Sequence, residues 1–306
     1  MNHLLGVLFA LGAATCWAIE PSIYVLGMKD TPPLLANAIR TSAAGVFSLI
    51  VVILWANFLG RLSFDRVQVV FLIAITFLGM GLGDWIYFTC LKHTEVSFVA
   101  GLVNTYPLFV ALFTILFGTD KLTPIALLAS IIIVSGVILV SKTKNSSETQ
   151  LAMYSTHLPK STLKKYRMTT ALAILVAFTW GITLFGLGFS LQYFSPLSAN
   201  AIRIPAVGGL LFMTFLLPPS NRKATMPSIS SQILLGIGGI FGLGIGSWMM
   251  LVSIKMLGTT RSSALLSVSP FFSVLIAILV LKEKPTLNRL GGILLVCLGV
   301  LLMLLS

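Results

Sequence analysis

Stretches of about 20 predominantly apolar residues recur along almost the whole chain, separated mostly by short polar segments. Each is long enough to cross the hydrocarbon core of a bilayer as a helix. In that core a backbone satisfies its own hydrogen bonds only as a helix or a closed barrel, and the short alternating strands of a barrel are missing here. Only 9% of the 306 residues are charged, against about 25% in a soluble domain. The sequence therefore predicts an all-α membrane protein.

Ten apolar stretches are predicted to span the membrane, and one long polar connection divides them into two groups of five. The connection, residues 142–169, is rich in lysine and arginine. The predicted spans are 4–27, 34–56, 69–91, 96–117, 124–141, 170–192, 197–217, 232–254, 262–281 and 289–305.

The two groups of spans repeat the same sequence positions. Residues 36–40 and 199–203 both read ANAIR, which sets an offset of 163 residues. Without a gap, the same offset pairs Trp17 with Trp180, Gly83 with Gly246, Trp85 with Trp248, Lys92 with Lys255, Pro107 with Pro270 and Lys121 with Lys284. Such a match through five spans indicates an internal duplication. We therefore divide the chain into a first five-helix repeat at 1–143, a basic polar linker at 144–163 and a second five-helix repeat at 164–306.

The odd number of spans in each repeat determines how the repeats are oriented. After five crossings the chain enters the membrane from the opposite side, so the two copies are expected to be inverted repeats about an axis in the membrane plane. Secondary transporters are often built this way, with the substrate near the repeat interface and alternately open to each side. The duplication therefore predicts ten transmembrane helices as two inverted five-helix repeats, and alternating access.

Segments 96–137 and 262–300 resemble the closing part of an EamA-type repeat. In both, a proline early in the fourth helix precedes an acidic residue with a basic neighbour and a glycine-containing fifth helix; these residues are Pro107 with Asp120–Lys121, and Pro270 with Glu283–Lys284. The tryptophan of each first helix and the arginine of each second helix also fit. One difference is that the first helix usually carries Trp-Gly, whereas this chain has Trp17–Ala18 followed by Glu20–Pro21.

The resemblance covers nearly all of both halves and identifies the chain as a member of the drug/metabolite transporter superfamily. It implies ten helices and export or exchange of small metabolites such as amino acids, nucleobases or drugs. We expect a secondary transporter in the plasma membrane, in contact with lipid and a small-molecule substrate, with a proton as a candidate coupling ion. A flippase for lipid or lipid-linked substrates with the same fold is the alternative. No cofactor, metal, nucleic acid or enzymatic activity is expected, and the chain is expected to be a monomer or homodimer.

Two indications of orientation disagree. Outside the spans, five lysine and arginine residues lie on the face that carries both termini and thirteen on the opposite face. The positive-inside rule therefore places the termini outside. The family resemblance implies termini inside. The net charge of +12 lies mostly in connecting segments, so membrane orientation explains it better than nucleic-acid binding does.

Four ionisable residues lie inside predicted spans: Glu20, Arg40, Asp84 and Arg203. Each costs about 2.5–3.5 kcal/mol at the bilayer centre, so such residues pair with one another or face a wet cavity. At about 1.5 Å per helical residue, Glu20, Arg40 and Asp84 all lie about 10 Å below the same membrane face and can meet in one layer. Arg203 lies about as deep below the opposite face.

The charged residues allow a functional and a structural interpretation. In the first half two acids outnumber one arginine, and the excess carboxylate could bind a cationic group or a coupling proton. In the second half Thr183 and Ser247 replace the acids, so Arg203 could attract a substrate carboxylate or phosphate, or a first-half acid. The structural interpretation is that the arginines only tie helices together. The four charges sum to zero, which suits a zwitterionic substrate.

Helical spacing places polar and aromatic residues on the same faces as these charges. Glu20 shares a face with Trp17 and Tyr24, and Asp84 shares one with Tyr87. The predicted substrate-binding residues are Glu20, Arg40, Asp84, Arg203, Trp17, Trp180, Asn37, Asn200, Tyr24 and Tyr87. For the two tryptophans, interfacial anchoring or packing is the alternative.

Small residues and prolines are expected to shape the helices. Gly79/Gly83 and Gly242/Gly246 are spaced four apart, which allows helices to approach closely. Four prolines within spans are expected to kink or interrupt their helices: Pro21, Pro107, Pro205 and Pro270.

Overall fold

The structure, a computed structural model, describes residues 2–29, 31–54, 65–94, 96–117, 123–141, 160–217, 226–273 and 287–305. These residues form helices and turns, and they include no strand. Seven helices are long and apolar enough to cross a membrane: His3–Gly27, Pro33–Leu54, Arg66–Lys92, Val99–Phe117, Arg167–Ser190, Pro196–Leu216 and Ile229–Leu257. Two further helices are apolar but shorter, at Pro124–Leu139 and Leu290–Leu304. The all-α membrane fold is thus confirmed, whereas the predicted span 262–281 extends outside the described residues.

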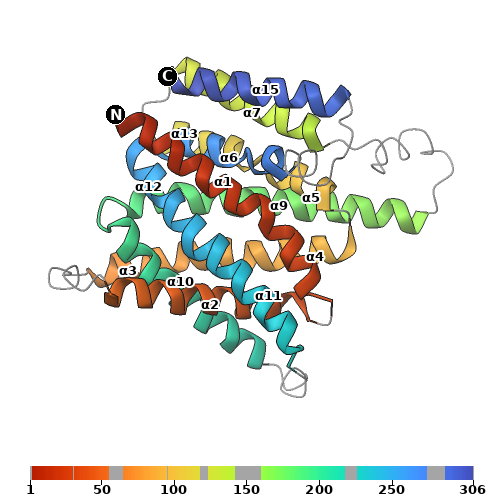
Figure 1. The fold of residues 1–306 in the computed structure, drawn as a ribbon, viewed down its shortest axis with the longest axis vertical. Helices are drawn as coiled ribbons and strands as arrows, with labels where there is room; N and C mark the ends of the chain where they lie inside the picture. The colour runs from red at the N-terminus through yellow and green to blue at the C-terminus, as the bar shows by residue number, and fades with distance from the viewer. Residues whose placement is uncertain are drawn as a thin grey trace.

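Figure 1 shows these helices as one bundle. The first half contains α1 (Asn2–Gly27), α2 (Pro33–Leu54), α3 (Arg66–Thr76), η2 (Phe77–Gly83), α4 (Asp84–His93), α5 (Val96–Val103), α6 (Tyr106–Phe117) and α7 (Pro124–Ser141). The second half contains α9 (Lys160–Ser190), α10 (Pro196–Leu216), α11 (Ile229–Gly239), η4 (Ile240–Gly246), α12 (Ser247–Leu257), α13 (Thr259–Leu266) and α15 (Leu287–Leu304).

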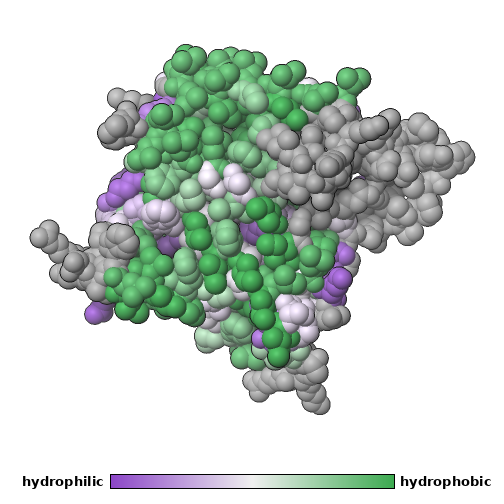
Figure 2. All heavy atoms as spheres, in the orientation of Figure 1, coloured by the Kyte–Doolittle hydropathy of each residue, from purple (hydrophilic) through white to green (hydrophobic). Residues whose placement is uncertain are grey.

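The outer surface of the bundle suits a lipid environment. Figure 2 shows apolar side chains over most of the visible face, with hydrophilic residues mainly at the two sides of the view. Large apolar side chains are strongly exposed along α2 and α6, for example Ile53 at 62% and Ile115 at 60%. In water such a surface would be an aggregation hazard, whereas in a bilayer it faces hydrocarbon.

Two π-helical turns, η2 and η4, occupy corresponding places in the two halves. The sequence analysis did not predict them, although it predicted close helix contacts at their glycines. A β-carbon added to Gly79 in η2 would lie 2.7 Å from Thr183 Oγ1 of α9, and one added to Gly242 in η4 would collide with the Glu20 carboxyl group of α1. The close approach is therefore confirmed. Such π-turns are rare and are often found at functional sites.

Two of the four prolines interrupt their helices, as predicted. The helix breaks at Asn104–Thr105, just before Pro107, and α13 ends at Leu266 before helix resumes at Ser269. A proline lacks the N–H that would continue the helical hydrogen bonds, and its ring clashes with the preceding turn. The two breaks approach each other, with Ser269 Oγ 3.5 Å from Asn104 Oδ1. By contrast, Pro21 and Pro205 lie inside α1 and α10, and neither helix is interrupted.

Helices from the two halves pack in reciprocal pairs. In the pair α2 and α10, a β-carbon on Gly45 would lie 2.9 Å from Pro205 Cα, and one on Gly208 would lie 2.8 Å from Ser42 Oγ. The pair α7 and α15, side by side in Figure 1, likewise meets through glycine. Because the glycines lack side chains, the helix backbones come into close contact across the boundary between the halves.

Candidate functional site

Arg40 on α2 joins three helices of the first half. It is 3% exposed, and its Nη1 donates to Glu20 Oε1 on α1 at 3.2 Å. Its Nη2 pairs with Asp84 Oδ2 at the start of α4. The structure therefore brings together Glu20, Arg40 and Asp84, which the sequence predicts to lie at the same depth in the membrane.

The rest of the Arg40 guanidinium is also occupied. Nε donates to Asn37 Oδ1 at 3.0 Å, and Nη1 also donates to the Tyr24 hydroxyl at 3.0 Å, which in turn donates to Glu20. The guanidinium carbon lies 4.8 Å from the ring centre of Tyr24 and 4.6 Å from that of Phe88, which is cation–π geometry. This first cluster compensates the buried cation fully and still contains one acid more than it has bases.

Arg203 on α10 occupies the corresponding place in the second half, but without an acid. Nε and Nη2 donate to Asn200 Oδ1 at 3.1 and 2.8 Å, and Nη2 also donates to Ser247 Oγ. The side chain is completely buried, and its Nη1 has no hydrogen-bond partner among the described residues. No carboxylate of the described residues forms an ion pair with it. Glu20 and Asp84 both pair with Arg40, so the alternative that one of these two acids serves Arg203 is not met in this structure.

The two asparagines connect each arginine to a π-turn of the same half. Asn37 Nδ2 donates to the carbonyl oxygens of Met80 at 2.7 Å and Gly81 at 3.2 Å in η2. Asn200 Nδ2 donates to the carbonyl oxygen of Gly244 in η4 at 3.2 Å. These carbonyls are accessible because the π-turn changes the helical hydrogen-bond pattern and its glycines have no side chains. Each asparagine thus fixes the position of an arginine relative to a π-turn.

The two tryptophans, both half-buried, hydrogen-bond across the boundary between the halves. Trp180 Nε1 on α9 donates to Asp84 Oδ1 at 2.8 Å. Trp17 Nε1 on α1 donates to the Gly242 carbonyl oxygen in η4 at 3.1 Å. The Trp180 ring contacts Tyr87 edge-on, with centroids 5.3 Å apart, and Tyr106 at 6.1 Å. Tyr106 was not predicted, although its place beside the Pro107 break could have indicated it; its buried hydroxyl has no partner within the described ranges.

The ten predicted residues therefore fall into separate groups. One connected cluster contains Glu20, Tyr24, Asn37, Arg40, Asp84, Tyr87 and Trp180. A second cluster contains Arg203 and Asn200, and Trp17 contacts η4. The π-turn η4 lies between the clusters, because its Gly242 packs against Glu20 and its Gly244 accepts from Asn200.

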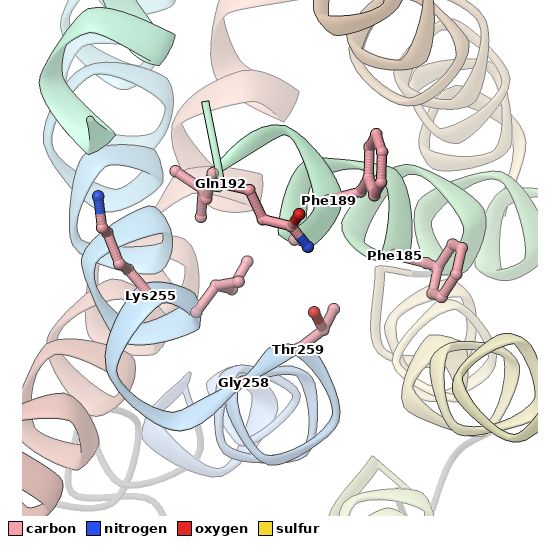
Figure 3. A pocket seen from close by; sticks show the side chains of 9 residues that line it. Phe185, Phe189, Gln192, Lys255, Gly258 and Thr259 are labelled. Carbon is pink, nitrogen blue, oxygen red and sulfur yellow. The ribbon is translucent and has the colours of Figure 1, made fainter. Parts of the chain in front are cut away.

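A cavity of about 250 Å³ lies elsewhere, where α9 and α12 end and α13 begins. It is lined by Phe185, Gly188, Phe189, Leu191, Gln192, Ile254, Lys255, Gly258 and Thr259, none of which was predicted as a site residue. In Figure 3 the polar ends of Gln192 and Thr259 face the same space, with the two phenylalanines on α9 beside it. Gly258 has φ 83°, a left-handed conformation that favours glycine at the tight turn between α12 and α13.

Comparison with known proteins assigns the family. The model of the EamA-like transporter family matches twice, at residues 4–142 and 167–305. The chain belongs to the EamA-like transporter family. An uncharacterized transporter of Archaeoglobus fulgidus is 28% identical to this EamA-like protein over 303 residues, which cover 99% of each chain. The uncharacterized transporter YyaM of Bacillus subtilis is 26% identical over 141 residues, covering 46% of this chain and 44% of YyaM.

A crystal structure shows the same fold. It aligns with a TM-score of 0.74 over 97% of this chain and 95% of its own, at 16% identity. As a member of the EamA-like family, the chain is a multi-pass integral membrane transporter in contact with lipid, and the plasma membrane is the typical location of such proteins. The family and the names of the relatives indicate transport of a small molecule rather than enzymatic catalysis.

The Trp180–Asp84 hydrogen bond gives a first testable prediction. Trp180→Phe keeps an aromatic ring but removes the donor to a buried carboxylate, a bond worth about 1.5–3 kcal/mol. Trp17→Phe is the matched control. The hydrogen bond that it removes runs from Trp17 Nε1 to a neutral carbonyl oxygen and is worth about 0.5–1.5 kcal/mol. Thermal unfolding in detergent should show the larger loss for Trp180→Phe. Equal losses would mean that the Asp84 contact contributes no more than an ordinary hydrogen bond.

Proposed function

We propose that this EamA-like protein is a secondary transporter that exports or exchanges a small polar metabolite by alternating access. Amino acids, nucleobases and drug-like amphiphiles are the candidate substrates. The observation that carries the proposal is one arrangement built twice: an arginine and an asparagine on one helix, held against a glycine-rich π-turn on the next. The first copy contains Glu20 and Asp84, whereas Thr183 and Ser247 stand at the equivalent positions of the second, so the two half-sites differ in charge.

The proposed architecture is ten helices in two inverted repeats, at 1–143 and 164–306, joined by a basic linker at 144–163. Three observations support it. Both family matches and both π-turns are separated by the same 163 residues as the ANAIR segments. The reciprocal contacts between α2 and α10 are those that a two-fold axis between the repeats would generate. Both chain ends lie on one side of the view in Figure 1, as expected for an even number of crossings.

The proposed substrate site consists of the two clusters on either side of η4. In the first cluster, Glu20 and Asp84 would attract a cationic group or carry a coupling proton. Trp180 contacts Asp84, and Tyr87 and Tyr106 contact the Trp180 ring, so the three would supply aromatic faces for a cation or an apolar portion of the substrate. The remaining predicted residues are proposed to orient these groups. Monomer or homodimer remain the proposed assembly states.

Alternating access requires contacts that differ between the inward-open and outward-open states. The bond from Trp180 on α9 to Asp84 on α4 joins the proposed repeats directly. A substrate or proton that competes for Asp84 would weaken this bond and favour movement of one repeat against the other. Substrate binding and reorientation would thereby be coupled through one carboxylate.

Proton coupling can be tested with the acids of the first cluster. Glu20→Gln and Asp84→Asn keep the side-chain shapes but remove the charges. We expect both variants to lose accumulation driven by a pH gradient in proteoliposomes loaded with radiolabelled amino acids or nucleobases. Exchange without a gradient would survive if the acids serve only coupling, and would disappear if they also bind substrate. Wild-type, gradient-dependent flux in both variants would remove these acids from the mechanism.

A lipid flippase is the second candidate, and the cavity between α9, α12 and α13 favours it. The cavity combines Gln192 and Lys255 with Phe185 and Phe189, and the Phe189 side chain is 40% exposed on the apolar surface. A lipid headgroup could occupy the polar side while an acyl chain follows the phenylalanines. Translocation of a fluorescent phospholipid between leaflets of proteoliposomes, compared with protein-free vesicles, tests this function. No acceleration over protein-free vesicles would exclude it for that lipid.

A further inference from the structure

One edge of the Arg203 guanidinium lacks the partner that the equivalent edge of Arg40 has. Arg40 Nη1 donates to Glu20 Oε1 at 3.2 Å, whereas Arg203 Nη1 finds no hydrogen-bond partner in the part of the chain that the structure describes. The residue that corresponds to Glu20 by the offset of 163 is Thr183. Its hydroxyl donates to the Ile75 carbonyl oxygen at 3.0 Å and supplies no charge to the arginine. The second half therefore lacks both carboxylates of the first: Ser247 takes the place of Asp84 and still contacts the guanidinium, whereas no described residue takes the place of Glu20.

The missing charge is physically significant because Arg203 is completely buried. Arginine keeps its charge in proteins, and an unpaired cation in a low-dielectric interior is strongly unfavourable. Asn200 and Ser247 contribute neutral oxygens, which orient the guanidinium without compensating its charge. Within the described part of the chain, both ion pairs belong to Arg40. A buried cation that is held in position but not neutralised favours binding of an anion.

We propose that Arg203 binds a carboxylate of the transported molecule, so that the substrate class is amino acids or other small organic acids. The inference rests on the proposed transport function. A guanidinium suits a planar carboxylate, and one unpaired cation suits a monovalent anion better than a phosphate dianion, which would leave a negative charge in the interior. The substrate carboxylate accepts a hydrogen bond from Arg203 Nη1, as the Glu20 carboxylate accepts one from Arg40 Nη1. Glu20 packs against Gly242 of η4, the same π-turn that Asn200 contacts at Gly244, so an amino group on the same molecule would meet the acidic cluster.

The chain provides a matched pair of variants for testing this. Thr183 packs against Gly79 just as Glu20 packs against Gly242, and both glycines leave space for the neighbouring side chain. Thr183→Glu should therefore place an internal carboxylate next to Arg203 Nη1. Thr183→Gln has nearly the same shape and no charge. Arg203→Gln removes the guanidinium that is proposed to bind the carboxylate.

The experiment measures thermal stabilisation and equilibrium binding with the purified full-length protein in detergent. The probes are single amino acids and small organic acids, each paired with its carboxamide, with sodium chloride at equal ionic strength as the simple anion. Wild type and Thr183→Gln should be stabilised by at least one acid and not by its amide. Arg203→Gln should bind that acid about 10- to 150-fold more weakly, the loss of one charge-assisted hydrogen bond. Thr183→Glu should be more stable without ligand and should no longer respond to the acid.

Several results would overturn the proposal. They are equal stabilisation by acid and amide, no response of wild type to any carboxylate, and a full response in Arg203→Gln or Thr183→Glu. Chloride alone matching the acids would assign the site to a simple anion and not to a substrate. Flux assays separate this inference from the transport function. Arg203-dependent binding without flux in proteoliposomes would support the binding site and contradict transport. Wild-type flux of a carboxylate in Arg203→Gln would support transport and contradict the binding site.

Discussion

Replacing Arg40 with methionine is expected to destabilise the protein by about 3–5 kcal/mol, the usual effect of removing one partner from a buried ion pair. Arg40 contacts Glu20 Oε1 at 3.2 Å and pairs with Asp84, and all three residues are buried. Without the guanidinium, two carboxyl groups would remain close together in the interior with no cation. Thermal unfolding of the full-length protein in detergent, followed by size-exclusion chromatography, measures the loss.

Arg203→Met is the matched control for Arg40→Met. It removes a side chain of the same size at the equivalent position, but no ion pair between described residues is broken there. Because an unpaired buried charge is replaced by an apolar group, its effect on stability should be small or favourable. Adding Glu20→Gln and Asp84→Asn to Arg40→Met should recover part of the loss, since no unpaired acid remains. Equal destabilisation by both arginine variants would show that the ion pairs around Arg40 contribute little.

Gly242→Ala is expected to impair transport by moving the Glu20 carboxyl group. A β-carbon at this position would collide with that group, which is held between Arg40 and Tyr24 and has little freedom to move aside. Displacing the acid loses a charge-assisted hydrogen bond, worth about 1.5–3 kcal/mol. We expect an unfolding temperature below that of wild type and a flux reduced about 10- to 150-fold in proteoliposomes.

Gly79→Ala is the corresponding change in the other half. Its new methyl group would lie 2.7 Å from Thr183 Oγ1, which is also crowded although less severely than at Gly242, and no charged residue moves. A second substitution, Glu20→Asp, shortens the acid by one methylene and should partly restore stability in the Gly242→Ala background. If Gly79→Ala reduced flux as strongly as Gly242→Ala, general crowding of the π-turns, rather than the position of Glu20, would explain the effect.

Together these variants test whether η4 couples the two clusters. The turn contacts the acid cluster through Gly242 and the Arg203 cluster through the Gly244 carbonyl oxygen, two residues further along. It also accepts the Trp17 hydrogen bond. A shift in η4 would therefore change the surroundings of both charged clusters at once. The observed π-turn supplies the altered hydrogen-bond pattern that such a shift would need.

The sequence by itself determined the membrane fold, because the thickness of the bilayer fixes the length of each apolar stretch. It also determined that Glu20, Arg40 and Asp84 lie in one layer, because the helical rise converts position in a span into depth. The offset of 163 residues predicted that Asn200 and Arg203 repeat the roles of Asn37 and Arg40, and their contacts correspond.

Only the tertiary structure decided which partner each polar group has. Helix rotation and the approach of glycines set the contacts of Trp180 with Asp84 and of Gly242 with Glu20, between residues 96 and 222 positions apart. Spacing along one helix gives a face but not the neighbouring helix that meets it. For the same reason the π-turns, Phe88 and Tyr106 could not be inferred from periodicity. The helix packing also decides that Glu20 and Asp84 both pair with Arg40, which leaves Arg203 Nη1 without a partner among the described residues.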